Sequence, residues 1–382
     1  MARSVDPRLF LVALGMWAAG LAAAPAESPP GSAQPTPRLR RGTGFGSGVA
    51  FSPDGATLAA GRQDGTVALF PFSDLGAIGE PRSIGVADEQ FSKFRSGPGP
   101  IRFSPDGAIL VASNFLDPID LRDHRRVGPD ALRAWDVASG RVLYTVPMGG
   151  LGRTFAITAD GRTLRATVST GRDDDVIRSW DLKTGSPMVS VPLATPGVVA
   201  TEFSPDGETL AVVAAWRETI AFHEVATGRV RSSWADRRGG EAPRRFHSLA
   251  YSPDGRTLAA LGDDHVVQLW DVTSGKPRAS IAPPPDDSIR HHYRMAFSAD
   301  CRRLALAGGY SVPRPAGKPI AGRIILVDVA TGARLVAFEG MSPSCRDLAL
   351  TLDGRTLAST FVEFPGTVPE DTLSVYDVPA DR

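Results

Sequence analysis

Arginine and histidine side chains recur a few residues before a repeated turn, and they are the groups in this sequence best suited to bind a partner. Eight residues form this set: Arg102, Arg153, Arg245, His247, His292, Tyr293, Arg294 and Arg346. Guanidinium groups bind carboxylates through paired hydrogen bonds, and aromatic rings beside them add stacking. The set predicts a binding site for an acidic peptide or an anionic glycan. The alternative is that these charges face solvent or pair with aspartates of nearby loops.

Metal binding and catalysis have less support in the residue spacing. His291 and His292, with Asp263 or His265 nearby, supply the nitrogen and oxygen ligands that zinc accepts. Adjacent residues of a strand point to opposite faces, however, and neither an HExxH nor a CxxC spacing occurs. The glycines of residues 42–48 alternate instead of following GxGxxG, and no GxSxG or phosphate-binding loop is present. We therefore predict no metal, no cofactor and no catalytic residue.

A short turn, repeated along the chain, positions the candidate residues. Seven copies are present: FSPDG at 51–55 and 103–107, ITADG at 157–161, FSPDG at 203–207, YSPDG at 251–255, FSADC at 297–301 and LTLDG at 350–354. Proline presets φ, aspartate accepts a local backbone hydrogen bond and glycine adopts positive φ. The apolar runs around the fourth copy predict strands over 198–203, 209–214, 219–224 and 230–234. Each repeat is therefore predicted to be a four-stranded antiparallel meander.

A second motif closes the third predicted strand of each repeat. Trp-Asp pairs stand at 135–136, 180–181 and 270–271, with weaker forms such as His223-Glu224, and a Ser/Thr-Gly turn follows most of them. Together with the repeated turn, these pairs resemble the WD40 family, whose repeats of about 40 to 45 residues form the blades of β-propellers. The resemblance implies an all-β, seven-bladed β-propeller with four antiparallel strands per blade over residues 38–382. The chain departs from the family in having no Gly-His pair, so the polar network that this histidine joins is incomplete here.

The two ends of the repeat region are predicted to meet. The last repeat ends after its third strand, and residues 36–42 are the unassigned segment able to complete it. An N-terminal strand added to the last blade would close the ring and cover a sheet edge. The connections vary in length, since the span from the turn glycine to the Trp position is 15 residues in the first repeat and 28 in the second. Loops on a rigid scaffold carry binding, so we predict that the face with variable loops is the binding face.

The N-terminus has the layout of a secretory signal peptide. Basic residues flank its start, residues 9–24 form an uncharged apolar run, and a small-residue cleavage site follows. We predict a signal peptide over 1–26 with cleavage after Ala26, and a Pro/Ser-rich linker over 27–37. The protein is then exported, periplasmic or secreted, with no membrane span after cleavage. An uncleaved membrane anchor is the alternative.

The cysteine and charge content indicate which covalent links and which classes of partner to expect. Cys301 and Cys345 fall at opposite ends of neighbouring predicted strands, too far apart for a disulfide, so we predict two unpaired thiols. Basic and acidic residues number 42 each, so no overall field attracts nucleic acid or an anionic membrane. Arginine far outnumbers lysine, a usage typical of a GC-rich bacterial genome.

These observations favour a non-catalytic, monomeric scaffold that binds a protein or peptide outside the cytoplasm through the variable loop face. The fold alone does not decide this, because propellers host unrelated functions. An exported propeller enzyme, hydrolase-like or lactonase-like, with a site in the central channel is the alternative. A partner for an exported redox protein is a third hypothesis, which the sequence does not separate from the first.

Overall fold

The computed structural model places most of the repeat region. It describes residues 37–41, 44–72, 78–85, 99–113, 130–171, 174–214, 219–235, 245–282, 291–309, 322–341, 344–363 and 370–379. The chain divides into two units, residues 1–34 and 35–382, and every described residue lies in the second. The predicted signal peptide and almost all of the predicted linker fall outside the described residues. Within the described ranges, no helix has the length and apolar character needed to cross a membrane.

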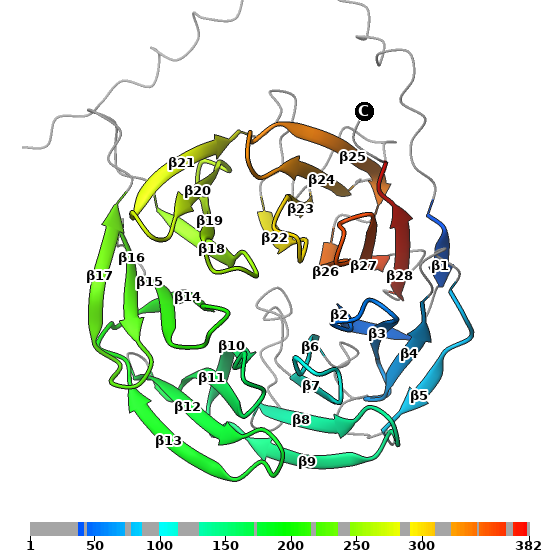
Figure 1. Ribbon diagram of the computed structural model, residues 1–382, viewed down its shortest axis with the longest axis horizontal. Coiled ribbons are helices and arrows are strands. Elements are labelled where there is room, and N and C mark those ends of the chain that lie inside the picture. The colour runs from blue at the N-terminus through cyan, green and yellow to red at the C-terminus, as the bar shows by residue number, and fades with distance from the viewer. Residues whose placement is uncertain are drawn as a thin grey trace, which may run out of the picture. The chain divides into compact units, whose positions relative to one another are not determined.

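Seven four-stranded antiparallel sheets form a ring of blades, numbered one to seven here in chain order (Figure 1). The innermost strands are β2 (Phe45–Phe51), β6 (Gly99–Phe103), β10 (Leu151–Ile157), β14 (Val198–Phe203), β18 (Phe246–Tyr251), β22 (His291–Phe297) and β26 (Ser344–Leu350). The second strands are β3 (Thr57–Arg62), β7 (Ile109–Ser113), β11 (Thr163–Ser169), β15 (Thr209–Ala214), β19 (Thr257–Gly262), β23 (Arg303–Gly309) and β27 (Thr356–Glu363).

Two further strands complete each blade. The third strands are β4 (Val67–Pro71), β8 (Ala131–Asp136), β12 (Asp175–Asp181), β16 (Thr219–Glu224), β20 (Val267–Asp271), β24 (Gly322–Asp328) and β28 (Glu370–Asp377). The outermost strands are β5 (Arg82–Ile84), β9 (Val142–Pro147), β13 (Pro187–Pro192), β17 (Val230–Ala235), β21 (Lys276–Ile281), β25 (Arg334–Met341) and β1 (Leu39–Arg41). The predicted seven-bladed fold is confirmed, and the strands predicted within 198–235 match β14 to β17 to within one residue.

The repeated turn joins the first two strands of each blade through the same hydrogen bonds. In blade one, the Ser52 hydroxyl donates to Asp54 Oδ1 at 2.5 Å and accepts a hydrogen bond from Thr57 N–H at 2.9 Å. Ala56 N–H donates to the same Asp54 oxygen at 3.0 Å, as predicted for the aspartate. The hydroxyl–aspartate bond recurs in every blade: Ser104–Asp106, Thr158–Asp160, Ser204–Asp206, Ser252–Asp254, Ser298–Asp300 and Thr351–Asp353. The Ser52 hydrogen bond holds the pKa of Asp54 below its ordinary value, so this carboxylate stays ionised.

The Trp position of the repeat lies in the apolar layer between neighbouring blades. Trp135 and Trp270 are almost fully buried there. Blade four has His223 instead, with Nε2 3.0 Å from the Thr195 hydroxyl and Nδ1 2.9 Å from the Gly228 carbonyl oxygen. Burial lowers the pKa of His223, so the imidazole that takes the place of the tryptophan is neutral. Both of its ring nitrogens have a hydrogen-bond partner.

The last blade is completed from the other end of the repeat region. Strand β1 pairs antiparallel with β28, with Arg40 opposite Ser374, so blade seven has the strand order β26-β27-β28-β1. An ion pair joins Arg38 Nη1 to Asp377 Oδ1 at 2.8 Å beside this pairing. The predicted ring closure by an N-terminal strand is confirmed.

Neither Cys301 nor Cys345 forms a disulfide, as predicted. Cys301 takes the place of the turn glycine in blade six and adopts a φ of 61°. Cys345 is buried on β26, the innermost strand of blade seven. The two residues therefore occupy different blades, one in a turn and one near the start of a strand.

The turn hydroxyl gives a direct test of what holds a blade together. Replacing the fully buried Ser252 by Ala leaves Thr257 N–H without its 2.9 Å acceptor. An unpaired buried donor costs about 1–3 kcal/mol, so the free energy of unfolding should fall by that amount in urea titrations. Ser274→Ala is the control, because its hydroxyl bond to Asp271 is exposed and water can replace it. Equal losses for the two variants would contradict this role for the inner turn.

Candidate functional site

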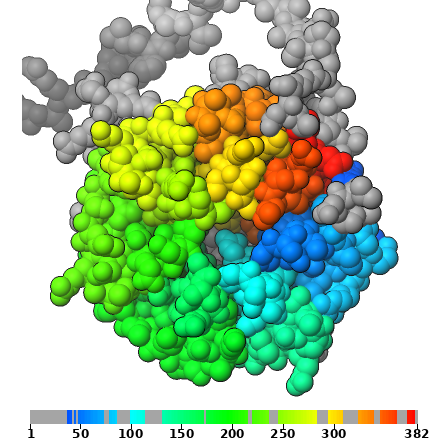
Figure 2. All heavy atoms as spheres, in the orientation of Figure 1, coloured from blue at the N-terminus to red at the C-terminus, as the bar shows by residue number. Residues whose placement is uncertain are grey.

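The seven innermost strands enclose a central hollow, and their side chains set its chemistry. Figure 2 shows the ring hollowed at its centre on the face in view. The residue directly before the apolar residue of each turn is alanine in five blades: Ala50, Ala156, Ala250, Ala296 and Ala349. The other two blades carry Arg102 on β6 and Glu202 on β14. The alanines pack in the apolar layers between blades, so Arg102 and Glu202 are side chains of opposite charge at a position that is otherwise small and apolar.

The Glu202 carboxyl is an acid of the hollow whose pKa is raised. Protein atoms surround the Glu202 carboxyl group on all sides, although the residue as a whole is only partly buried. Burial raises the pKa of Glu202 from its ordinary 4.5 to about 7, against the opposing effects of the Arg102 charge and a hydrogen bond with Thr154. Residues of blades two, three and four thus act on one carboxyl group. Such a group exchanges its proton near neutral pH, as general acid–base groups do.

Asp347 on β26 lies where the first and last blades meet. Its Oδ2 accepts a hydrogen bond from Val49 N–H on β2 at 3.1 Å, and its Oδ1 accepts one from Leu348 N–H at 3.0 Å. Burial raises the pKa of Asp347, while the charges of Arg102 and Arg294 act to lower it. The carboxyl group therefore joins blade seven to blade one, under the influence of arginines from blades two and six.

The residues predicted from the sequence lie at or on the inner strands. Arg153, His247 and Arg346 occupy equivalent positions, four residues before the apolar residue of their turns. The first two are exposed, whereas Arg346 is buried. Arg294 is partly buried, and Arg245 is exposed directly before β18. His292 and Tyr293 belong to β22, but their side chains lie outside the described part of the structure.

Carboxylates accompany these cations, so the hollow has mixed charge. Arg153 Nε donates to Asp175 Oδ1 at 2.9 Å, and the Asp175 side chain is only 2% exposed. Arg102 Nη1 donates to the carbonyl oxygen of Ile101 at 3.1 Å. With Glu202 and Asp347 nearby, the structure distributes cations and carboxylates around the centre rather than presenting a uniformly basic surface.

Sequence reasoning missed Glu202 and Asp347 as members of this cluster. The signal for Glu202 is present in the repeat itself, because its position is alanine in five of seven copies. Asp347 departs from its repeat less clearly, since the equivalent residues include Gly48, Thr154 and Ser248. Its role depends on the closure of the ring, which places β2 beside β26.

The remaining predictions concern a metal site and the variable loops. Among the described residues, no group of three or more His, Cys, Asp or Glu side chains is placed to hold a metal ion. His265 adopts a φ of 64° in the turn between β19 and β20. Most of the variable loops that the sequence assigns to the binding face lie outside the described residues, including 88–98 and all but the first two residues of 308–321. The hypothesis that these loops bind a partner stays a prediction.

Comparison with known proteins places the repeats in context. The family model described as "WD domain, G-beta repeat" matches residues 47–70 and 243–271. The chain is 26% identical over 173 residues to the small ribosomal subunit protein RACK1 of Caenorhabditis elegans, covering 44% of this chain and 49% of the relative. It is 22% identical over 175 residues to the cross-pathway control WD-repeat protein 2 of Flammulina velutipes, covering 44% of this chain and 50% of the relative. The chain thus spans about half the length of these curated relatives.

The raised pKa of Glu202 predicts a pH-dependent contribution to stability. The folded state binds a proton between pH 4.5 and about 7 that the unfolded state has released, so this contribution is present at low pH and is lost as the pH rises through 7. Glu202→Gln cannot ionise, so its free energy of unfolding relative to the wild type should increase from pH 5 to pH 8. A change on the order of 1–2 kcal/mol is expected after screening by water in the hollow.

Urea titrations at several pH values measure this difference. Glu208→Gln, an exposed acid in the same blade that pairs with Arg165, is the control for the loss of a carboxylate. A flat difference between Glu202→Gln and the wild type would contradict the assignment of a raised pKa to Glu202.

Proposed function

We propose that this chain, a member of the WD40-repeat β-propeller family, is a non-catalytic, monomeric scaffold that binds a protein or peptide outside the cytoplasm. The bound segment carries acidic side chains and lies across the variable-loop end of the inner strands. Arg245 and His247 of blade five are exposed residues of this surface. Arg294 of the neighbouring blade six and the arginines of more distant blades provide further positive charge.

One observation supports this location above the others. Cationic side chains from five blades, namely Arg102, Arg153, Arg245, Arg294 and Arg346, belong to or directly precede the inner strands of one closed ring. A closed ring fixes their spacing before any partner arrives, and a pre-arranged surface loses less conformational entropy on binding. Guanidinium groups also favour carboxylates, through charge-assisted hydrogen bonds.

The carboxylates beside these arginines limit the kind of partner that the surface can bind. Asp175 is already paired with Arg153, and Asp347 lies within reach of the charges of Arg102 and Arg294. These acids offset part of the positive charge, so a long polyanion such as nucleic acid is disfavoured. A peptide with one or two acidic side chains fits a surface of mixed charge better, because it meets selected cations and avoids the carboxylates.

An enzyme with its site in the central hollow is the second candidate, and Glu202 is the observation that favours it. A carboxyl group with a pKa of about 7 is suited to transfer protons at neutral pH. A hydrolase and lactonase screen of the purified protein decides between the two candidates. Activity that is lost in Glu202→Gln would replace the scaffold proposal, and no turnover of any substrate in the wild type would retain it.

The partner surface is tested with a double variant. Arg245→Ala with His247→Ala removes two exposed groups of blade five, and it should weaken a partner identified by crosslinking in native cells at least about tenfold. Affinity is measured by biolayer interferometry, with thermal unfolding as a check that the variant folds. Arg256→Ala is the matched control, because this exposed arginine lies in the inner turn of the same blade. Equal binding by the double variant and the wild type would remove the partner from this surface.

Export is tested separately from partner binding. Expression of the full chain in a bacterial host, followed by mass spectrometry of the N-terminal peptide, should show a mature protein that starts at Glu27 in the periplasm or medium. This result is expected because signal peptidase cleaves after small residues that follow an apolar run. An intact N-terminus in the membrane fraction would favour an uncleaved anchor, and an intact N-terminus in the cytoplasm would contradict export.

A further inference from the structure

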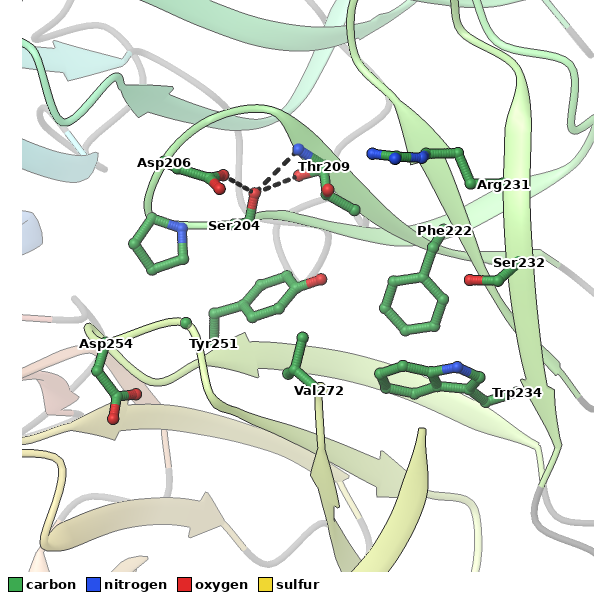
Figure 3. Close-up of a pocket in the computed structure, with 12 residues that line it drawn as sticks. Ser204, Asp206, Thr209, Phe222, Arg231, Ser232, Trp234, Tyr251, Asp254 and Val272 are labelled. Atoms are coloured by element: carbon green, nitrogen blue, oxygen red, sulfur yellow. Dashed lines mark hydrogen bonds between the residues drawn. The ribbon is translucent and has the colours of Figure 1, made fainter. Parts of the chain in front are cut away.

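A cavity of about 340 Å³ lies between blades four and five. Its volume is at the small end of ligand sites, which span about 300–1,000 Å³. The inner turns of the two blades form one side of the cavity, and strands β16 and β17 form another (Figure 3). The residues that line it do not include the charged residues of the central hollow, which are Arg102, Arg153, Asp175, Glu202, Arg294, Arg346 and Asp347.

Tyr251 places an unsatisfied hydroxyl group in this cavity. The equivalent position is a hydrocarbon side chain in the other six blades: Phe51, Phe103, Ile157, Phe203, Phe297 and Leu350. Tyr251 is 9% exposed, and its buried hydroxyl has no hydrogen-bond partner within the described residues. Figure 3 shows the hydroxyl directed towards Phe222 at the wall of the cavity, where its oxygen is almost fully buried. Burial raises the pKa of Tyr251, so the group is a donor that lacks an acceptor.

Arg231 brings a cation to the same cavity. Strand β17 has a bulge opposite β16, where Val230 pairs with His223 and Ser232 pairs with Phe222, which leaves Arg231 as the extra residue. Bulges redirect side chains in this way. Figure 3 shows the Arg231 side chain reaching over the cavity and the Ser232 hydroxyl directed towards Phe222. Three donor groups from two blades therefore line one small space.

Aromatic rings form a fixed wall beside these donors. The rings of Phe222 and Trp234 have centroids 3.9 Å apart, and Trp234 stacks on Trp270 of blade five with centroids 5.7 Å apart. The turn of blade five lies close against this wall, because a Cβ built at Gly275 would come within 2.7 Å of Trp234 Nε1. The wall is therefore held in place before any ligand arrives, and it offers a flat apolar surface.

Two carboxylates limit the charge that the cavity accepts. Asp206 and Asp254 line its turn side, and Asp206 Oδ1 already accepts the Ser204 hydroxyl at 2.5 Å. The two acids outnumber the single cation Arg231, so a dianionic phosphate ester would be repelled more strongly than a single carboxylate that pairs with Arg231. The donors, the aromatic wall and the acidic end together select one class of ligand.

We propose that this cavity binds a monocarboxylate with a flat apolar body. The body lies against Phe222 and Trp234, and the carboxylate accepts hydrogen bonds from the Tyr251 hydroxyl and the Arg231 guanidinium. Two sources supply this chemistry, a free aromatic acid or the C-terminal residue of a polypeptide that ends in an aromatic side chain. The site is separate from the partner surface proposed above.

Binding of defined probes to the full chain tests the proposal. The probes are 3-phenylpropionate and its neutral amide, together with an acetylated Gly-Gly-Phe peptide with a free or an amidated C-terminus. Saturation-transfer NMR and calorimetry measure binding. Each acid should bind at least about tenfold more tightly than its amide, because the amide loses the charge-assisted hydrogen bond with Arg231.

Two variants and one control locate the binding site. Arg231→Gln should weaken the acids about tenfold, and Tyr251→Phe should weaken them severalfold without lowering the Tm, since it removes a hydroxyl that has no partner in the free protein. Arg229→Gln, an exposed arginine in the adjacent turn that does not line the cavity, should bind like the wild type. Arg245→Ala with His247→Ala should also leave probe binding unchanged, so failure of the partner surface and failure of this site are distinguishable.

The source of the ligand follows from the probe that binds better. Tighter binding of the free-acid peptide than of 3-phenylpropionate would assign the site to a polypeptide C-terminus, and the reverse order would assign it to a small aromatic acid. No binding of either acid at millimolar concentration would overturn the proposal. Unchanged affinity in Arg231→Gln and Tyr251→Phe, or a lowered Tm in Tyr251→Phe, would also overturn it, because the hydroxyl would then serve the fold.

Discussion

The hydrogen bond between a buried hydroxyl and the turn aspartate is the interaction on which the rest of this structure depends. In every blade it fixes the connection between the innermost strand and its neighbour. A slip of one residue in that hairpin would turn each side chain of the inner strand to the opposite face. The turn therefore decides which residues meet the hollow and which pack between blades, and it holds even where Cys301 replaces glycine at positive φ.

Because the turn sets a common register, a residue that departs from the repeat can be interpreted physically. Arg102 and Glu202 are charged where five blades have alanine, and the charge of Arg102 in blade two lowers the pKa of Glu202 in blade four against the effect of burial. Tyr251 adds a hydroxyl where six blades have a hydrocarbon side chain, and that hydroxyl is buried without a partner in the described structure. Both departures place polar or charged groups where the other blades have apolar side chains. Burying such groups lowers the stability of the fold, so apolar packing does not account for their presence.

The sequence was sufficient for the scaffold and insufficient for the site, for identifiable reasons. Turn residues and apolar runs are local signals, so β14 to β17 and the closing strand β1 could be predicted closely. The Arg153–Asp175 ion pair could not, because Asp175 looks like a loop residue in the sequence and is the buried first residue of β12. The cavity of blades four and five also escapes local reasoning, since Arg231 reaches it through a bulge and Tyr251 comes from the next blade.

The hollow and the cavity are linked through one pair of neighbouring inner strands. Glu202 on β14 and Tyr251 on β18 lie in adjacent blades, and after burial the charge of Glu202 is the largest contribution that raises the pKa of Tyr251. Glu202 itself changes charge near pH 7. The protonation state of the hollow therefore alters the electrostatic potential at the hydroxyl that lines the cavity, without any movement of the strands. Since the closed ring holds Glu202 and Tyr251 at a fixed separation, ionisation of Glu202 in the hollow changes the electrostatic potential in the cavity between blades four and five.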